Sequence, residues 1–233
     1  MKKNLLLLAM LVCLVVNVQA QSDSKAPNWE DKKESNTEES EILNNLAMAQ
    51  SLAVYGKRNN SVEALVLAAK ILRQLPSCSK LEISKKSEGE GKATEKGSSA
   101  MIVLDEATLL AEAQRIAGKD KILNGLIASV EKTPKFRGAV GGPRIAYERV
   151  LAFDTDSYLI PFVGGRRAYV AVNGDGDTDL DLYVYDENGN LIDKDDDYLD
   201  RCVVEWYPKW TGVFIIKVKN RGSVYNNYSI MTN

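Results

Sequence analysis

The first part of the chain carries apolar residues at helical spacing. In residues 41–56, four apolar residues recur at spacings of four, three and four, which places them on one face of a helix, and Gly56 is a stop signal. A second helix is expected from Asn60, which can cap it together with Glu63, to just before Pro76. The buried positions predicted for this helical hairpin are Ile42, Leu46, Ala49, Ala53, Leu65, Ala68 and Leu72.

A second helical hairpin is predicted further along the chain. Asp105 can cap one helix that Gly118 closes, and Asp120 can cap another that ends before Pro134. Alanine-rich helix pairs are also found in tetratricopeptide-like repeats, but these two pairs share no consensus. The buried positions predicted here are Leu109, Ala113, Ile116, Leu123, Leu126, Ile127 and Val130.

Beyond Phe136 the apolar spacing changes to two. Short segments rich in valine, isoleucine and tyrosine are separated by glycine, asparagine or aspartate, which predicts strands joined by turns. Strands at this density indicate an antiparallel β-sandwich or jelly roll, so the whole chain is expected to be α+β with the helices first. The predicted strands are residues 145–153, 158–163, 168–172, 179–186, 191–193, 202–207, 213–219 and 225–231.

The chain begins with the layout of a secretory signal peptide. Two lysines precede an apolar run, and a small-x-small site predicts cleavage after Ala20. The apolar run is shorter than the roughly 18 to 20 residues that span a bilayer, which argues against an anchor, and the residue before Cys13 argues against lipidation. We expect an exported protein, periplasmic or extracellular, whose mature chain has no transmembrane segment.

Composition divides the mature chain into segments. Residues 21–40 are polar and charged and predict a disordered tether. Residues 41–134 are the helical region, within which residues 77–99 have the glycine-rich, mixed-charge composition of a flexible insertion. Residues 136–233 are the predicted sandwich.

Charge and cysteine content narrow the function. Removing Lys2 and Lys3 with the signal peptide leaves 28 basic and 32 acidic residues, a net charge of −4, which argues against nucleic-acid binding. Cys78 and Cys202 remain, and in an oxidising compartment they are a candidate disulfide, with two free thiols as the alternative. The chain has no histidine, which excludes Ser-His-Asp and Cys-His catalysis and histidine-containing zinc sites.

The C-terminal part contains an acidic strand and hairpin. The segments GDGDTDLDLYVYDENGN, DKDDD and TGVFIIKVKNRG follow the strands SYLIPFVGG and AYVAV. In this order, over about residues 153–233, they resemble the bacterial pre-peptidase C-terminal domain. The resemblance implies a small β-sandwich, itself non-catalytic, of the kind appended to secreted enzymes, although no recognisable peptidase precedes it here. The whole layout is similar to that of uncharacterised exported bacterial proteins.

Aspartates in this part suggest a calcium site. Between residues 175 and 200 there are eleven acidic residues and one lysine. The spacing partly follows a Ca²⁺-binding loop, with Asp181 and Asp186 at positions 7 and 12, but position 6 is Leu180 rather than glycine. The alternative is that the aspartates cap turns and protect sheet edges. The candidate Ca²⁺ ligands are Asp175, Asp177, Asp179, Asp195, Asp196 and Asp197.

A ligand-binding face is predicted on the strand at residues 179–186. Alternation places Leu180, Leu182 and Val184 in the core and the intervening residues on the solvent side. Aromatic and acidic residues on a solvent-facing sheet can bind a glycan or a protein. The candidate ligand-face residues are Asp181, Tyr183 and Tyr185.

We therefore expect an exported, non-catalytic binding module that recognises an unknown protein or glycan of the cell envelope. One alternative is a secreted hydrolase, or an accessory to one, that uses carboxylates or lysine; S-x-x-K occurs at residues 22–25, 77–80 and 129–132. A second alternative is that the helices are an adaptor for another protein.

Overall fold

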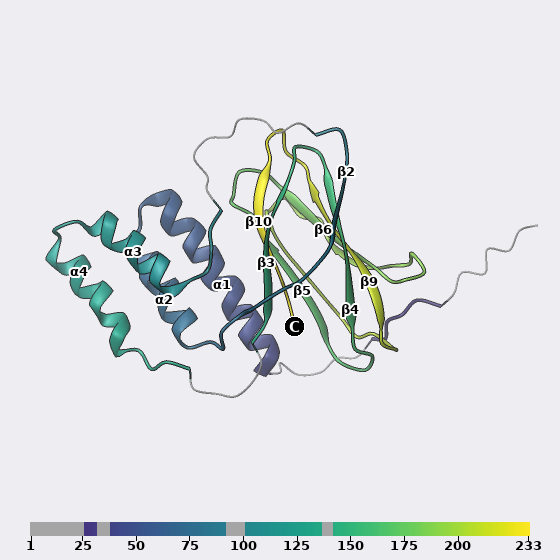
Figure 1. The fold of residues 1–233 in the computed structure, drawn as a ribbon, viewed down its shortest axis with the longest axis horizontal. Helices are drawn as coiled ribbons and strands as arrows, with labels where there is room; N and C mark the ends of the chain where they lie inside the picture. The colour runs from purple at the N-terminus through teal and green to yellow at the C-terminus, as the bar shows by residue number, and fades with distance from the viewer. Residues whose placement is uncertain (1–25, 32–37, 92–100, 137–141) are drawn as a thin grey trace, which may run out of the picture.

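Helices lie on one side of a two-sheet sandwich (Figure 1). The computed structural model describes residues 26–31, 38–91, 101–136 and 142–233. The described residues confirm the predicted α+β order, because the helices precede the main strands. They form helices α1 (Glu38–Asn59), α2 (Val62–Arg73), α3 (Glu106–Ala117) and α4 (Lys121–Ala128) and the 3-10 helix η1 (Ser129–Lys132).

The predicted helix stop at Gly56 is wrong. α1 continues through Gly56 to Asn59, and a Cβ added at Gly56 would lie 2.7 Å from Cγ of Leu65 in α2. The glycine therefore serves close packing of the two helices. Propensity cannot distinguish this role from a helix end, because both favour a residue without a side chain.

Three of the predicted helix caps can be compared with the structure. Asp105 accepts a hydrogen bond from Thr108 N, and Asp120 accepts from Ile122 N and Leu123 N, so both N-caps are confirmed. The predicted cap at Asn60 is wrong. Ser61 is the N-cap of α2 instead, while Asn60 takes a left-handed backbone conformation with a φ of 52° that turns the chain between α1 and α2.

All eight predicted strands are present in the sandwich, and two short polar strands join them. The strands are β1 (Ser79–Lys80), β2 (Lys85–Glu88), β3 (Arg144–Val150), β4 (Thr155–Phe162), β5 (Ala168–Asn173), β6 (Leu180–Tyr185), β7 (Leu191–Asp195), β8 (Arg201–Trp206), β9 (Gly212–Asn220) and β10 (Asn226–Thr232).

The strands form a jelly roll. One sheet has the order β1-β3-β10-β5-β8 and the other the order β2-β4-β9-β6-β7. Apart from β6 with β7 and the short strands, neighbours in a sheet are distant in sequence, because the other successive strands alternate between the sheets. All pairs are antiparallel except β1 with β3.

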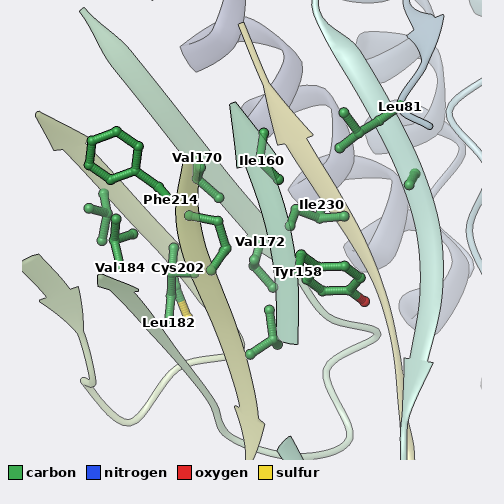
Figure 2. Packing of buried hydrophobic residues seen from close by; sticks show 14 of the residues in the cluster. Leu81, Tyr158, Ile160, Val170, Val172, Leu182, Val184, Cys202, Phe214 and Ile230 are labelled. Atoms are coloured by element: carbon green, nitrogen blue, oxygen red, sulfur yellow. The ribbon is translucent and has the colours of Figure 1, made fainter. Parts of the chain in front are cut away.

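The core of the sandwich comes from the inward-facing residues of both sheets. Figure 2 shows Phe214 and Val184 of the second sheet packed near Val170 and Cys202 of the first. At one end this core becomes polar: the Tyr158 and Tyr228 hydroxyls meet, and Tyr228 donates a hydrogen bond of 2.8 Å to the buried Asp156 carboxylate.

Helix α1 covers the outer face of the first sheet. Leu43 and Leu46 of α1 form a buried cluster with Tyr169, Ala171 and Met231 of β5 and β10. As a result every residue of β5 is buried, on one side by the second sheet and on the other by the helix. The helical region and the sandwich therefore share an apolar interface.

Two segments predicted to lack structure contribute to the fold. Part of the predicted flexible insertion forms β1 and β2, which add an edge strand to each sheet. Their residues are exposed and polar, so the sequence has no apolar pattern that predicts these strands. Part of the predicted tether docks at the sandwich, where Glu30 pairs with Tyr207. The predictions of disorder are wrong for these parts, and the signal peptide and residues 92–100 lie outside the described residues. The described ranges contain no helix that is both long and apolar enough to cross a membrane.

Candidate functional site

Asp175, the first predicted calcium ligand, links the β5–β6 loop to β10. It is 3% exposed, and its Oδ2 accepts hydrogen bonds from N and Nδ2 of Asn227 at 2.9 and 3.0 Å. Its own N–H donates to Oδ1 of Asn226 at 3.2 Å. The carboxylate therefore has protein donors that hold two segments of the sandwich together.

Asp177 lies opposite the last turn of α1. Its carboxylate is 3.8 Å from Arg58 Nη2, and Arg58 Nη1 donates to the carbonyl oxygen of Gly176 at 2.6 Å. Gly176 has a φ of 83°, and a Cβ there would lie 1.9 Å from Arg58 Nη1. Glycine is thus needed both for the turn and for the approach of the guanidinium group.

Asp179 and Asp200 differ from these two aspartates because each has a buried carboxylate oxygen without a hydrogen-bond partner among the described residues, Oδ1 in Asp179 and Oδ2 in Asp200. Burial raises the pKa of Asp179, and the neighbouring Asp181 raises it further. Burial also raises the pKa of Asp200, opposed by a hydrogen bond from the backbone of Gly176. Among the aspartates of the acidic segment, these two have a buried oxygen that the described residues leave without a hydrogen bond.

Asp186, at the twelfth position of the calcium-loop pattern, is an anchor for the turn after β6. Its carboxylate is fully buried and accepts from the backbone N–H groups of Asn28, Asn188 and Asn190 at 2.9–3.0 Å. Burial alone would raise the pKa of Asp186, but these hydrogen bonds, with one from the Asn190 amide, outweigh it and lower the pKa. Asp186 also holds the docked N-terminal segment in place.

The remaining predicted calcium ligands lie in and after β7. Asp195 Oδ2 accepts from Val203 N at 2.8 Å, Asp197 Oδ1 accepts from Leu199 N at 2.9 Å, and Asp196 pairs with Lys194. Over the part of the chain that the structure describes, no group of three or more acidic or cysteine residues is placed to hold a metal ion. The calcium site stays a prediction, and the partners seen here are those of turns and strand ends.

The predicted ligand face lies on the outer side of β6, away from the core. Asp181 is 2% exposed because Arg221 pairs with it and the Tyr183 hydroxyl donates to it at 2.9 Å. Tyr185 lies under Lys217, whose Nζ is 5.4 Å from the ring centroid. All three residues are therefore engaged with basic residues, since Arg221 also donates to the Tyr183 hydroxyl at 3.2 Å.

An apolar band crosses the same face. Leu159 of β4 is the Cα partner of Ile215 in β9, Ile215 is the partner of Tyr185, and Tyr185 is the partner of Leu191 in β7. Leu159 is 63% exposed and Leu191 is 47% exposed. We define these four residues as the apolar band. The sequence signal was present, because residues 158–163 are apolar at both alternating sets of positions, but only strand order joins it to Tyr185.

Of the two alternatives for Cys78 and Cys202, a disulfide or two free thiols, the structure shows two free cysteines. Cys202 lies in the core between the sheets, where its Sγ is 3.0 Å from the carbonyl oxygen of Leu180. Cys78 packs on the helix side, against the cluster that contains Tyr169. The two thiols thus belong to different clusters, separated by the first sheet.

Two cavities lie between the helices and the first sheet. The larger, of about 810 Å³, is lined by polar groups that have partners: Arg73 pairs with Glu106 at 2.6 Å, and the Tyr147 hydroxyl accepts from Leu104 N at 2.9 Å. The smaller, of about 460 Å³, lies between α1 and the ends of β5 and β8 and is lined by Asn173 and Asp200. Both of these residues have buried polar atoms without a hydrogen-bond partner in the described structure.

Comparisons with known proteins add little. No protein-family model matches the chain. No curated protein matches it either. Among solved structures the chain is similar to the Yersinia pseudotuberculosis-derived mitogen, with 18% sequence identity over 40% of this chain and 86% of the mitogen chain and a TM-score of 0.32. A similarity this low carries no inference about function.

Proposed function

We propose that this protein is an exported, non-catalytic binding protein that uses the outer face of its second sheet to bind a protein partner. The two sheets differ in how they are covered. α1 buries the outer face of the first sheet, whereas the strands β4, β9, β6 and β7 have no helix over their outer face in the described ranges (Figure 1).

The apolar band is the observation that carries the proposal. Leu159, Ile215, Tyr185 and Leu191 are consecutive cross-strand neighbours, so their side chains form one continuous surface rather than scattered exposed residues. Val213 lies two residues before Ile215 in β9, on the same face of the strand. It is 41% exposed and extends the apolar band. Contiguous exposed apolar surface with a polar rim is typical of protein–protein interfaces.

Lysines beside the band favour a partner that carries carboxylates. Lys217 and Lys194 are the cross-strand partners of Tyr183, and Lys219 is the partner of Asp181, so one side of the band is bordered by a basic row. This local charge is opposite to the net negative charge of the chain. Charge complementarity of this kind sets the orientation and the rate of association more than the affinity.

Export and the absence of catalysis are supported by the sequence. The signal-peptide pattern in residues 1–20 supports export, and the chain has no histidine for general acid–base work at neutral pH. The aspartates of the acidic segment bind backbone N–H groups and basic side chains of the fold. These contacts are the structural ones expected in a recognition module.

The proposal can be tested by affinity capture of partner proteins from the native envelope. The wild-type protein is compared with the variant Leu159→Asp. Leu159 is exposed, so the variant should fold, and a carboxylate in the band should repel an acidic, apolar partner. The matched control is Tyr198→Asp, at a tyrosine that is 95% exposed and outside the band. We expect one protein to be retained by the wild type and the control, released by high salt, and reduced at least tenfold by Leu159→Asp.

Equal capture by the wild type and Leu159→Asp would overturn the proposal. The proposal would also be overturned if the purified protein hydrolysed envelope polymers and the Leu159→Asp variant did so at the same rate.

A further inference from the structure

The smaller cavity contains an unsatisfied buried amide. Tyr169 and Ala171 of β5 face α1, so the alternation of the strand directs Asn173 to the same side. Asn173 is 3% exposed and lines the cavity, yet neither its Oδ1 nor its Nδ2 has a hydrogen-bond partner among the described residues. Leaving such a group unpaired is unfavourable, so a native fold retains it only with an occupant or at a cost in stability.

Two further polar groups without partners lie close by. Ser229 is the cross-strand neighbour of Asn173, which places the two side chains on one face, and its Oγ is buried and unpartnered in the described structure. Asp200 also lines the cavity, and its Oδ2 has no partner there. The cavity lining therefore contains an unpartnered amide and a carboxylate oxygen, and an unpartnered hydroxyl lies beside the amide on the same face of the sheet.

The charges around the cavity exclude a simple ion. A cation would be attracted by Asp200 but would meet the guanidinium groups of Arg58 and Arg201, which also line the cavity. An anion would be attracted by the arginines but would meet the carboxylate. A neutral ligand with several hydroxyl groups avoids both conflicts, because a hydroxyl donates to a carboxylate and both donates to and accepts from an amide.

Size and shape fit a small saccharide. The volume of about 460 Å³ lies within the roughly 300–1,000 Å³ that is typical of small-molecule sites. Tyr55 lines the cavity and is 56% exposed, so its ring is available to an apolar sugar face. We propose that the cavity between α1 and the ends of β5 and β8 binds a neutral mono- or disaccharide through Asn173, Asp200 and Tyr55.

This site is separate from the apolar band. The cavity lies on the outer side of the first sheet, beneath α1, whereas the band lies on the outer side of the second sheet. Leu159→Asp should therefore leave saccharide binding unchanged, and loss of saccharide binding should not affect capture of a protein partner. Each proposal can fail without the other.

Ligand-observed NMR and calorimetry on the mature chain test the site. The probes are glucose, galactose, mannose, N-acetylglucosamine and their β-linked disaccharides, with spermidine and glucuronate as charged comparisons. At least one neutral saccharide should bind at millimolar concentration or below and better than both charged probes. Tyr55→Ala and Asn173→Ala should each weaken it about tenfold, the loss expected from about 1.4 kcal/mol.

A tyrosine outside both proposed binding surfaces serves as the matched control. Tyr198→Ala removes a 95% exposed ring away from the cavity and should leave the affinity unchanged. Thermal melting checks the fold of Asn173→Ala. If that variant does not fold, the effect of Tyr55→Ala, a substitution at an exposed position, is used to test the site. The proposal is overturned if no neutral saccharide binds, if binding survives Tyr55→Ala, or if spermidine or glucuronate binds more tightly.

Discussion

Arg58 at the end of α1 donates a hydrogen bond from Nη1 to the carbonyl oxygen of Gly176, over 2.6 Å, and so joins the helical region to the acidic β5–β6 loop. The two residues are 118 positions apart in the chain. The contact also forms part of the wall of the smaller cavity, because both residues line it. The conformation of the acidic loop and the closure of the cavity therefore depend on the same arginine.

Arg58→Ala should lower the free energy of unfolding by about 1 kcal/mol, because the hydrogen bond and the weak attraction to Asp177 are both lost from a half-exposed site. Hydrogen exchange of residues 174–178 should become faster. Lys121→Ala, at another exposed helical cation, is the control and should change neither. Unchanged exchange in Arg58→Ala would show that the loop is held by other contacts.

Asp186→Asn should destabilise the protein by roughly 2 kcal/mol at neutral pH, because the new amide nitrogen opposes backbone N–H donors in a buried site. The pKa of Asp186 is lowered in the fold, so its contribution is present above the ordinary aspartate pKa of about 4 and is lost as the pH falls through the lowered value. The difference between variant and wild type in urea denaturation should shrink below about pH 4. A constant difference from pH 7 to pH 3 would contradict this assignment.

Asp200→Asn should have the opposite effect from Asp186→Asn. Without a bound ligand it should raise the free energy of unfolding at pH 7 by about 1 kcal/mol. Burial raises the pKa of Asp200, so the stability that its protonated form contributes is complete below the unfolded pKa and is lost as the pH rises through the raised value. The advantage of the variant should therefore vanish on acidification towards pH 4. Denaturation curves at the two pH values measure it, and a less stable variant at pH 7 would refute it.

The thiols should be free and slow to react. Burial raises the pKa of Cys78 to about 11, so at pH 8 only about one thiol in a thousand is ionised. Burial also raises the pKa of Cys202, which is fully enclosed. Mass spectrometry after iodoacetamide treatment of residues 21–233 should show little modification of Cys78 and Cys202 in the native protein and modification of both after denaturation without reductant. An unmodified pair in the denatured sample would indicate a disulfide.

Calcium at millimolar concentration should not raise the melting temperature. Asp175 already accepts from Asn227, and Asp195 and Asp197 accept from backbone N–H groups, so a metal ion would have to displace these donors. Thermal melting in calcium and in excess chelator provides the comparison. A midpoint several degrees higher in calcium would show that the acidic segment rearranges around the ion.

The helices and the main strands could be predicted because their residues repeat at the period of the element they form. Alternation in β6 and the caps at Asp105 and Asp120 are local signals, and the structure bears them out. The short strands β1 and β2 could not be predicted, because all their residues are exposed and an exposed edge strand has no apolar pattern. Docking of residues 26–31 depends on partners such as Tyr207 and Asp186 that are far away in sequence.

In the candidate sites, too, local features could be predicted from the sequence, whereas contacts between distant segments could not. The sequence identified Tyr185 as solvent-facing, but its neighbours Ile215 and Leu191 follow from the order of strands in the jelly roll. The sequence also contains glycines among the aspartates, whose purpose appears only in the structure. Gly176 makes room for Arg58, and no local pattern could reveal a contact with a helix at the other end of the chain.

By itself the sequence determined the class of the fold, the order of the helices and main strands, the inward face of β6 and the negative charge of the acidic segment, since these depend on neighbouring residues. The tertiary structure decided which aspartates have partners, that the two cysteines lie in different clusters, which sheet face stays open and where the unsatisfied Asn173 lies. Those properties arise from contacts between distant segments, and the packing of α1 on one sheet but not on the other creates them.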